Sequence, residues 1–379
     1  MERRRFLEIA AAAGTASMTA LAGCAAGWAG RRSADGDART PTDSVAGIDL
    51  PVPDDQLVRA VGPDTIAAIV EPAFAEDWTG LDPDGVSDPT LPDGAPVVGV
   101  ERDGRARAYP LRVLDWHEIV NDDLGGPIAV THCVLCGSSV VIERIVDGAE
   151  TVFGVSGLLW QEALVMYDRA TESRWSQLLA TAIQGPQTGE RLAVVDSTLT
   201  SWGEWRAAHP GTVVLLPPPD SVPIARPDRT HPYFRSKYNY EGEDQLIGYD
   251  ADRPDAVDIR TLVIGVVDGD AARAYPFDAV RQAGVVNDQV GERPVVVVVA
   301  PDGTLVAYDR RVGGRTRTFR EAGDRHIRAA GSRFERTTGR AVDGPHRGIE
   351  LVRANEYPPM FWRGWSNAHP ETTVYGSVV

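Results

Sequence analysis

The chain is poor in several kinds of residue, and each shortage excludes a class of protein. Among its 379 residues there is one lysine, Lys237, and the formal net charge is -16. Without a basic stripe the chain cannot neutralise a row of phosphates, so we exclude nucleic acid as a partner. There are only three cysteines, at positions 24, 133 and 136, which excludes a disulfide-stapled scaffold.

Long apolar runs are also missing. After residue 24, no stretch has the roughly 18 consecutive apolar residues that a membrane-spanning helix needs. We therefore expect a soluble body, and any attachment to a membrane has to come from the N-terminus.

The N-terminus resembles an export signal. Arg3 and Arg4 precede Arg5, Phe6 and Leu7, as in a twin-arginine signal, and a short alanine-rich stretch follows. Residues 21–24 read Leu-Ala-Gly-Cys, which resembles a lipobox whose cysteine is diacylated. Two acyl chains give stable anchoring. The sequence predicts a signal over residues 1–24 and a protein held by lipid at Cys24, outside the cytoplasm.

Residues 25–50 are rich in Ala, Gly, Ser, Asp, Thr and Pro, and they contain few large apolar residues. Such a composition cannot bury enough surface to fold, so we interpret this segment as a flexible tether.

The rest of the chain contains an internal repeat of about 160 residues. The anchors of the first copy, Tyr109-Pro110, Val120-Asn121-Asp122, Trp202-x-x-Trp205 and His209-Pro210, return as Tyr275-Pro276, Val286-Asn287-Asp288, Trp362-x-x-Trp365 and His369-Pro370. Their order never changes. We divide the chain into a first unit over residues 51–218, and a linker with a second, degenerate unit over residues 219–379.

Short β-branched runs bounded by turn residues dominate each unit, whereas helices are few and short. One helix is predicted to begin at Pro110 and another after Thr200-Ser201, with its end at Pro210. The predicted fold is therefore α+β, predominantly β, with two tandem copies of the unit.

Features that both copies share are interpreted as structural, and features of one copy as candidates for function. The first copy alone has Cys133 and Cys136 at C-x-x-C spacing, with His132 beside them, and it alone has His117 and Met166. Thiolate, imidazole and thioether are soft donors, which select Cu(I) or Zn over Mg or Ca. We predict a site for copper, or alternatively zinc, formed by Cys133, Cys136, His117 and one of His132 or Met166.

Two other interpretations of the cysteine pair stay open. It could be a dithiol/disulfide couple of a thiol oxidoreductase, since C-x-x-C spacing lowers the pKa of the first thiol. It could also be a structural disulfide in a non-enzymatic surface module. A c-type haem is excluded because Gly137, and not His, follows Cys136. Ser138 and Ser139 lie outside any G-x-S-x-G elbow, so the sequence names no catalytic residue.

Four segments of the first copy resemble a known family, the domain of unknown function 3179. They are residues 116–122 (Trp-His-Glu-Ile-Val-Asn-Asp), Cys133-x-x-Cys136-Gly137, residues 153–158 (Phe-Gly-Val-Ser-Gly-Leu) and residues 166–177, from Met166-Tyr167-Asp168-Arg169 to Trp175-Ser176-Gln177. The likeness extends from about Pro96 onward. Val134 stands where the family pattern has Pro. The resemblance implies an exported or membrane-associated protein and assigns no activity.

These observations lead to one functional expectation. The chain is predicted to be a lipid-anchored extracytoplasmic protein that holds a soft metal ion for metal handling or electron transfer. Membrane lipid at Cys24 and a redox or metal-donor protein are its expected partners.

Overall fold

The computed structural model describes residues 41–81, 90–224, 233 and 257–376. The twin arginine, Cys24 and most of the expected tether lie outside these residues, as does most of the linker. The end of the tether segment forms a small hairpin of β1 (Ser44–Val45) and β2 (Ile48–Asp49). Val45 and Ile48 pack against a buried cluster that contains Trp160, so this part of the segment is attached to the body.

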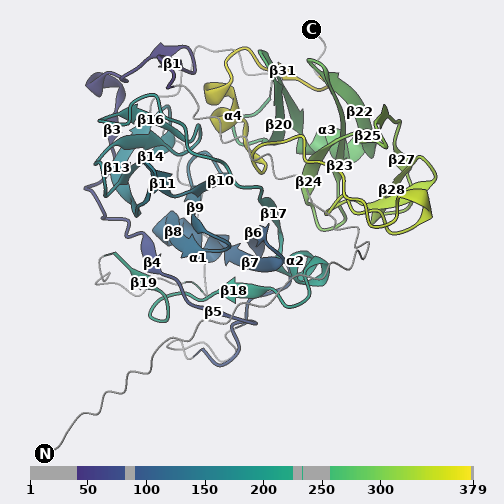
Figure 1. Ribbon diagram of the computed structural model, residues 1–379, viewed down its shortest axis with the longest axis horizontal. Coiled ribbons are helices and arrows are strands. Elements are labelled where there is room, and N and C mark those ends of the chain that lie inside the picture. Colours follow the sequence, from purple (N-terminus) through teal and green to yellow (C-terminus); the bar gives the residue numbers. More distant parts are fainter. Residues whose placement is uncertain (1–40, 82–89, 225–232, 234–256, 377–379) are drawn as a thin grey trace, which may run out of the picture. The chain divides into compact units, whose positions relative to one another are not determined.

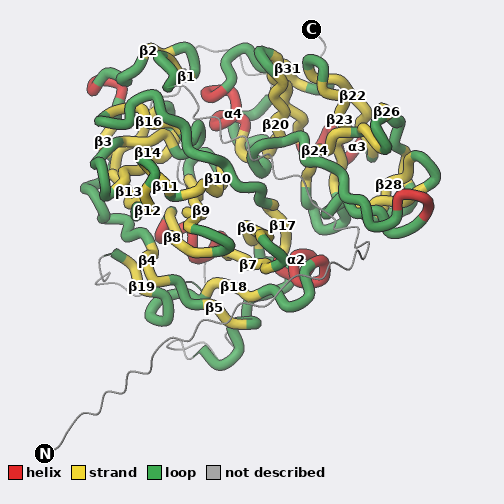
Figure 2. The backbone as a smooth tube through the Cα atoms, viewed as in Figure 1, coloured by secondary structure: helices red, strands yellow, loops and turns green. Residues whose placement is uncertain are grey.

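The predicted α+β fold of two tandem units is wrong. The chain is mostly β, with 44% strand and 11% helix, and its sheets are arranged as a six-bladed β-propeller. Figure 2 shows how strands and loops dominate the tube. Each α-helix has only seven residues, too few to form a layer that covers a sheet, so the sheets have to pack on one another.

Three sheets come from the first half of the chain, drawn in purple to teal in Figure 1. In strand order they are β17 (Thr198–Ser201), β6 (Pro96–Arg102), β7 (Arg105–Pro110), β18 (Val213–Leu215) and β5 (Phe74–Ala75); β10 (Ser138–Glu143), β9 (Pro127–Cys133), β8 (Ile119–Asp123), β4 (Ile69–Glu71) and β19 (Val222–Pro223); and β16 (Thr181–Gln184), β15 (Arg174–Ser176), β14 (Ala163–Asp168), β13 (Phe153–Trp160) and β3 (Val58–Arg59).

Three further sheets come from the second half, drawn in green and yellow. They are β30 (Met360–Phe361), β20 (Leu262–Asp268), β21 (Ala271–Pro276) and β31 (Thr373–Val374); β22 (Val285–Val290), β23 (Arg293–Val299) and β24 (Leu305–Asp309); and β27 (Arg320–Glu321), β28 (His326–Ala329) and β29 (Ser332–Glu335). Most neighbouring strands are antiparallel, although β7 with β18, β21 with β31 and β4 with β8 run parallel.

The remaining described elements are small. They are the hairpins of β11 (Ile145–Val146) with β12 (Ala149–Glu150) and of β25 (Arg311–Val312) with β26 (Arg315–Thr316), the 3-10 helices at Asp54–Gln56 and Gly344–His346, and the helices α1 (Leu111–His117), α2 (Trp202–Ala208), α3 (Phe277–Ala283) and α4 (Trp362–Ala368). Among the described residues, none of the helices combines the length and the apolar character that crossing a membrane would require.

The ends of two helices follow the sequence signals. α1 begins at Leu111, one residue after the predicted start at Pro110, which ends β7 and occupies the N-cap position without a side-chain hydrogen bond. Ser201 caps α2 by accepting a hydrogen bond from the backbone N–H of Glu204 at 3.3 Å. The end of α1 is unusual, because Glu118 has a φ of 54° in the left-handed region, where the matching residue after α3 is Gly284.

Residues shared by the two copies make equivalent contacts. Tyr109 and Tyr275 each hydrogen-bond an aspartate on the next strand, Asp122 at 2.5 Å and Asp288 at 3.1 Å. The Asn121 and Asn287 side chains both accept from the backbone N–H of a phenylalanine, Phe153 at 2.8 Å and Phe319 at 2.7 Å. We had interpreted the repeated Tyr-Pro and Val-Asn-Asp anchors as structural, and these contacts give them structural partners.

The hydrophobic clusters explain why the copies are not separate units. Among the described residues, two clusters belong to the first half and two belong to the second. A further cluster draws on both halves, because it contains Cys133, Cys136 and Trp175 together with Met360 and Trp362. The cysteine pair therefore lies where the two halves of the body share a core.

Candidate functional site

The cysteine pair lies at the turn between β9 and β10. These strands pair antiparallel, with Cys133 opposite Ser138, so the turn brings Cys133 and Cys136 to the same end of the hairpin. Gly137 has a φ of 56°, and a Cβ built on it would lie 2.7 Å from the Phe361 ring. Only glycine combines this backbone conformation with such a close approach.

Both thiols are free and buried, with side chains about as inaccessible as any in the core. The Cys133 Sγ lies 3.7 Å from the backbone oxygen of Glu162, and the Cys136 Sγ lies 3.0 Å from the Ser138 hydroxyl. Ser138 in turn contacts Gln177 Oε1 at 3.1 Å, and Gln177 Nε2 donates to Thr131 Oγ1 at 3.0 Å. A chain of buried polar groups therefore leads away from Cys136.

The two thiols differ in acidity. Burial raises the pKa of Cys133 well above its usual value, and the neighbouring Cys136 raises it further. Burial also acts to raise the pKa of Cys136, but hydrogen bonds from Cys133 and Ser138 and the charge of Arg363 outweigh it and lower that pKa. Cys136 is therefore the more acidic thiol of the pair, and Cys133 hydrogen-bonds it.

A buried ion pair lies beside the thiols. Arg363 Nη1 on α4 is 3.4 Å from Glu162 Oε2 in the turn between β13 and β14, and both side chains are at most 3% exposed. The Arg363 Nε has no hydrogen-bond partner in the described structure. The pair links the second half of the chain to the first and brings a positive charge close to Cys136.

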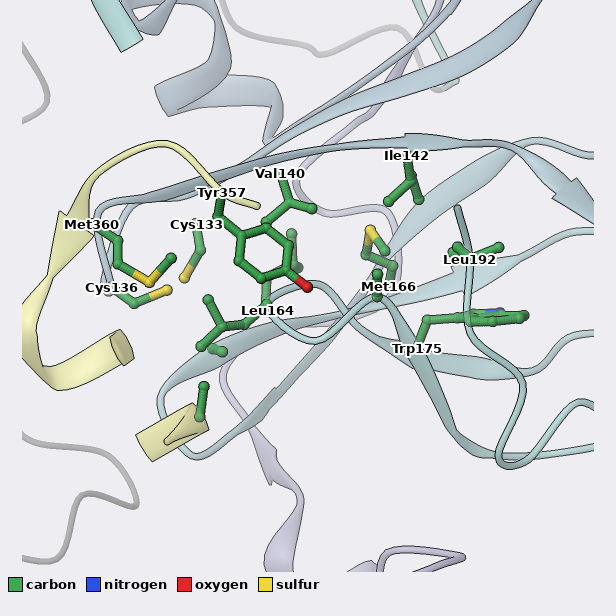
Figure 3. Packing of buried hydrophobic residues seen from close by; sticks show 14 of the residues in the cluster. Cys133, Cys136, Val140, Ile142, Leu164, Met166, Trp175, Leu192, Tyr357 and Met360 are labelled. Atoms are coloured by element: carbon green, nitrogen blue, oxygen red, sulfur yellow. The ribbon is translucent and has the colours of Figure 1, made fainter. Parts of the chain in front are cut away.

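The second half also covers the turn directly. The Phe361 backbone N–H on β30 donates to the Cys136 carbonyl at 3.0 Å. Met360 precedes it, and Figure 3 shows the Met360 thioether and the Cys133 and Cys136 sulfurs pointing toward one another. The structure thus gathers three sulfur-bearing side chains, of which the sequence analysis had named two.

His117, a predicted ligand, is fully buried and has other partners. Its Nδ1 lies 2.7 Å from the Ala67 carbonyl and its Nε2 lies 2.6 Å from the Tyr233 hydroxyl. A carbonyl only accepts, so Nδ1 donates to Ala67, and Nε2 shares a hydrogen bond with the Tyr233 hydroxyl and its proton. Burial raises the pKa of Tyr233, which keeps that proton in place. Both ring nitrogens of His117 are therefore engaged away from the thiols.

His132 is also turned away, and the reason is strand geometry. It precedes Cys133 on β9, and successive side chains of a strand point to opposite faces of the sheet. His132 accordingly contacts Ser139 Oγ at 3.0 Å and Asp115 Oδ1 at 3.4 Å, on the face that the thiols do not occupy.

Met166 shares the buried cluster with the thiols but is not their neighbour. It lies on β14 opposite Trp175, and Figure 3 shows its sulfur beside Ile142, apart from the three converging sulfur groups. Within the described ranges, no group of three or more His, Cys, Asp or Glu side chains is arranged to hold a metal ion. Methionine is not among these four residue types, so a site formed by two thiols and one thioether is a separate case.

Glu118 is a further unusual group near the turn. Its side chain is buried, and burial followed by the charge of Cys133 raises its pKa well above the usual value. The carboxyl is therefore protonated over a wider pH range than an exposed glutamate.

The sequence analysis missed Met360, Arg363 and Glu162, and a signal for the first two was present. When the tryptophans shared by the two copies are aligned, Met360 and Arg363 occupy the positions of Thr200 and Gly203 in the first copy. Met360 and Arg363 are specific to the second copy, so a comparison limited to residues specific to the first copy does not find them.

One family model matches the chain over most of its length. The model of a family described as a protein of unknown function, DUF3179, matches residues 63–372, which is most of the chain. The chain belongs to this family. The match begins before Pro96, where the resemblance had been placed, and it includes both copies and the cysteine turn.

No curated protein and no solved structure matches the chain. The function therefore has to be argued from the site itself.

Proposed function

We propose that this DUF3179 protein is a lipid-anchored extracytoplasmic protein that holds one soft metal ion, copper or alternatively zinc, through Cys133 and Cys136. The observation that carries the proposal is the pair of free, buried thiols in one turn, of which Cys136 has a lowered pKa. Metals bind the thiolate, so a site that acidifies a thiol before the ion arrives favours binding.

The surroundings favour retention of the ion over reaction at it. The Cys133 and Cys136 sulfurs are covered by β30, and the nearest polar groups belong to the protein. Closed sites of this kind hold a metal, whereas catalytic sites keep a position open for substrate. We therefore favour metal handling or electron transfer as the role of the site.

The same features argue against thiol-disulfide exchange. An oxidoreductase presents a partly exposed nucleophilic thiol, which in C-x-x-C proteins is the first cysteine with a lowered pKa. Here the first cysteine, Cys133, is buried and its pKa is raised. The exchange function remains an outcome of the test, together with a purely structural disulfide.

The location rests on the N-terminal sequence. Arg3, Arg4 and Cys24 lie outside the described residues, and their spacing in the sequence supports export in the folded state followed by lipidation. Fractionation tests this: the wild-type chain is expected with the membrane, and Cys24→Ser is expected in the soluble fraction.

Metal content tests the function. The full-length chain is purified with reductant, exposed to Cu(I) or to Zn(II), desalted and measured by mass spectrometry. We expect about one ion per chain in the wild type and almost none in Cys133→Ser or Cys136→Ser, because one thiolate is too weak a site. Cys24→Ser is the matched control and should keep its ion.

Equal, near-zero metal in the wild type and in Cys133→Ser would overturn the proposal. In that case, thiol titration at graded redox potentials separates the alternatives. A pair that cycles at a mildly reducing potential indicates an oxidoreductase, and a pair that stays oxidised and affects only stability indicates a structural disulfide.

A further inference from the structure

We infer that the ion is Cu(I) and that Met360, from the second half of the chain, is its third ligand. This inference rests on the proposed function and makes it more specific: the site has three sulfur donors, and both halves of the body are needed to form it.

The placement of Met360 is the first argument. Met360 is buried on β30, and the next residue, Phe361, hydrogen-bonds the Cys136 carbonyl. A Cβ built on Gly364 would lie 2.9 Å from the Cys136 Cβ and 3.7 Å from the Met360 Sδ, so both residues border the same point. In Figure 3 the Met360 sulfur and both thiols point into one small region.

The equivalent place in the other half supplies an independent argument. There, the turn between β23 and β24 holds Asp302 at the position of Cys136, and Thr200 on β17 stands at the position of Met360. The Thr200 hydroxyl donates directly to Asp302 Oδ2 at 2.8 Å. The residue at this strand position therefore faces the residue at this turn position in both halves of the body.

The chemistry of the pair is what differs. A threonine hydroxyl has a proton to donate to the Asp302 carboxylate, whereas the thioether of Met360 has none to donate to the Cys136 sulfur. A thioether and a thiolate can instead share a cation between them. Thioether sulfur is a soft, uncharged donor that suits Cu(I), and adds little for Zn(II), which binds well to thiolate and imidazole.

The experiment replaces each of two buried methionines with leucine, which conserves volume. Met360→Leu removes the inferred ligand, and Met166→Leu is the matched control from the same cluster. Cu(I) affinity is measured by competition with a chromophoric chelator, Zn(II) affinity is measured in parallel, and X-ray absorption at the copper edge counts the sulfur neighbours.

We expect three sulfur neighbours in the wild type and in Met166→Leu, and two in Met360→Leu. Met360→Leu should weaken Cu(I) binding by at least about tenfold, the lower end of the loss seen when a supporting group of a metal site is removed. Its Zn(II) affinity should stay within about twofold of the wild type, because the Zn(II) site depends on the two thiolates.

Unchanged Cu(I) affinity and sulfur count in Met360→Leu would overturn the inference while leaving the two-cysteine function intact. A wild type that binds no metal overturns the proposed function as well, so the two failures are distinguishable. If Met360→Leu does not fold, selenomethionine-labelled wild type replaces it: a copper neighbour at the selenium edge supports the inference, and none overturns it.

Discussion

The two hairpin turns that face the opposite half of the body have the same construction but different chemistry. In the second turn, Asp302 accepts hydrogen bonds from Thr304 Oγ1 at 2.6 Å, from Thr200 Oγ1 at 2.8 Å and from the Ser201 N–H at 3.3 Å. In the first turn, Cys136 stands at the position of Asp302 and Ser138 at that of Thr304, with Ser138 again near the acidic atom.

The comparison shows that hydrogen bonds in the same backbone arrangement lower the pKa of the residue at this position in both turns. Burial acts to raise the pKa of Asp302, but hydrogen bonds from Thr304, Thr200 and Ser201 lower it. In the second turn, the Asp302 carboxylate is satisfied by hydrogen bonds from neighbouring protein groups. The first turn has sulfur in place of the oxygen, and the facing strand carries Met360, whose thioether has no proton to donate.

The largest expected effect comes from the ion pair that only the first turn has. Arg363→Met leaves Glu162 charged in a buried place, and breaking such a pair typically costs about 3–5 kcal/mol of unfolding free energy. Arg206→Met, which removes a largely exposed pair with Asp93, is the control and should cost at most about 1 kcal/mol. Urea unfolding measures both, and equal losses would contradict the structural role assigned to Arg363.

The next largest expected effect is a loss of stability that should be equal in the two halves of the body. A Cβ on Gly99 would overlap the Trp205 ring, and a Cβ on Gly265 would overlap the Trp365 ring. Overfilling a packed core usually costs about 1–3 kcal/mol, so Gly99→Ala and Gly265→Ala should each lose that much. Thermal or urea unfolding of the two variants gives the comparison. A loss in one half alone would show that the shared tryptophans do not play equivalent roles.

A smaller effect is expected where α1 and α3 end. Glu118 has a left-handed backbone where its counterpart is Gly284, and a non-glycine residue in that region costs on the order of 1 kcal/mol. Glu118→Gly should therefore stabilise the chain by about 1 kcal/mol near pH 5. Gly284→Ala should destabilise it by a similar amount.

This gain should also depend on pH. The pKa of Glu118 is higher in the folded chain than in the unfolded chain. The wild type therefore loses stability as the pH rises from the unfolded-state pKa of Glu118 through its folded-state pKa. The advantage of Glu118→Gly, measured by urea unfolding across pH 4 to 8, should grow in that direction. A constant or shrinking advantage would show that the Glu118 carboxyl is not buried as described.

The smallest effect concerns the ionisation of Asp302. The pKa of Asp302 is lower in the folded chain than in the unfolded chain, where it is about 3.9. The ionised carboxylate therefore stabilises the fold at any pH above the unfolded-state pKa, and this contribution is lost as the pH falls through the folded-state pKa. Asp302→Asn should be less stable than the wild type near neutral pH, and the difference should shrink below about pH 4. A difference that does not change with pH would mean that Asp302 acts only through packing.

Local signals in the sequence predicted much of the secondary structure. The β-branched runs became strands, Ser201 caps α2 as expected, Pro110 directly precedes α1, and the copy-specific cysteines do share one turn. The class was wrong because the helix signals, although real, were too short to make a layer. Nothing in a local pattern says how six sheets are arranged around one another.

The candidate site was harder to predict because it depends on contacts between distant segments. His117 precedes Val-Asn-Asp in the sequence, but its partners are Ala67 and Tyr233, which lie far away along the chain. His132 could have been removed from the ligand set by strand alternation alone, since it neighbours Cys133 on β9. Met360 is specific to the second copy, so it could be found only by also listing the residues that the second copy has and the first copy lacks.

The hydrogen bond from Phe361 to Cys136 has a consequence for how the protein is made. The thiol turn is synthesised in the first half of the chain, but the strand that closes it comes close to the C-terminus. Contacts of such long sequence separation form late. During translation the two thiols therefore stay open to metal and to oxidants until β30 has emerged, and folding of its sheet ends that interval.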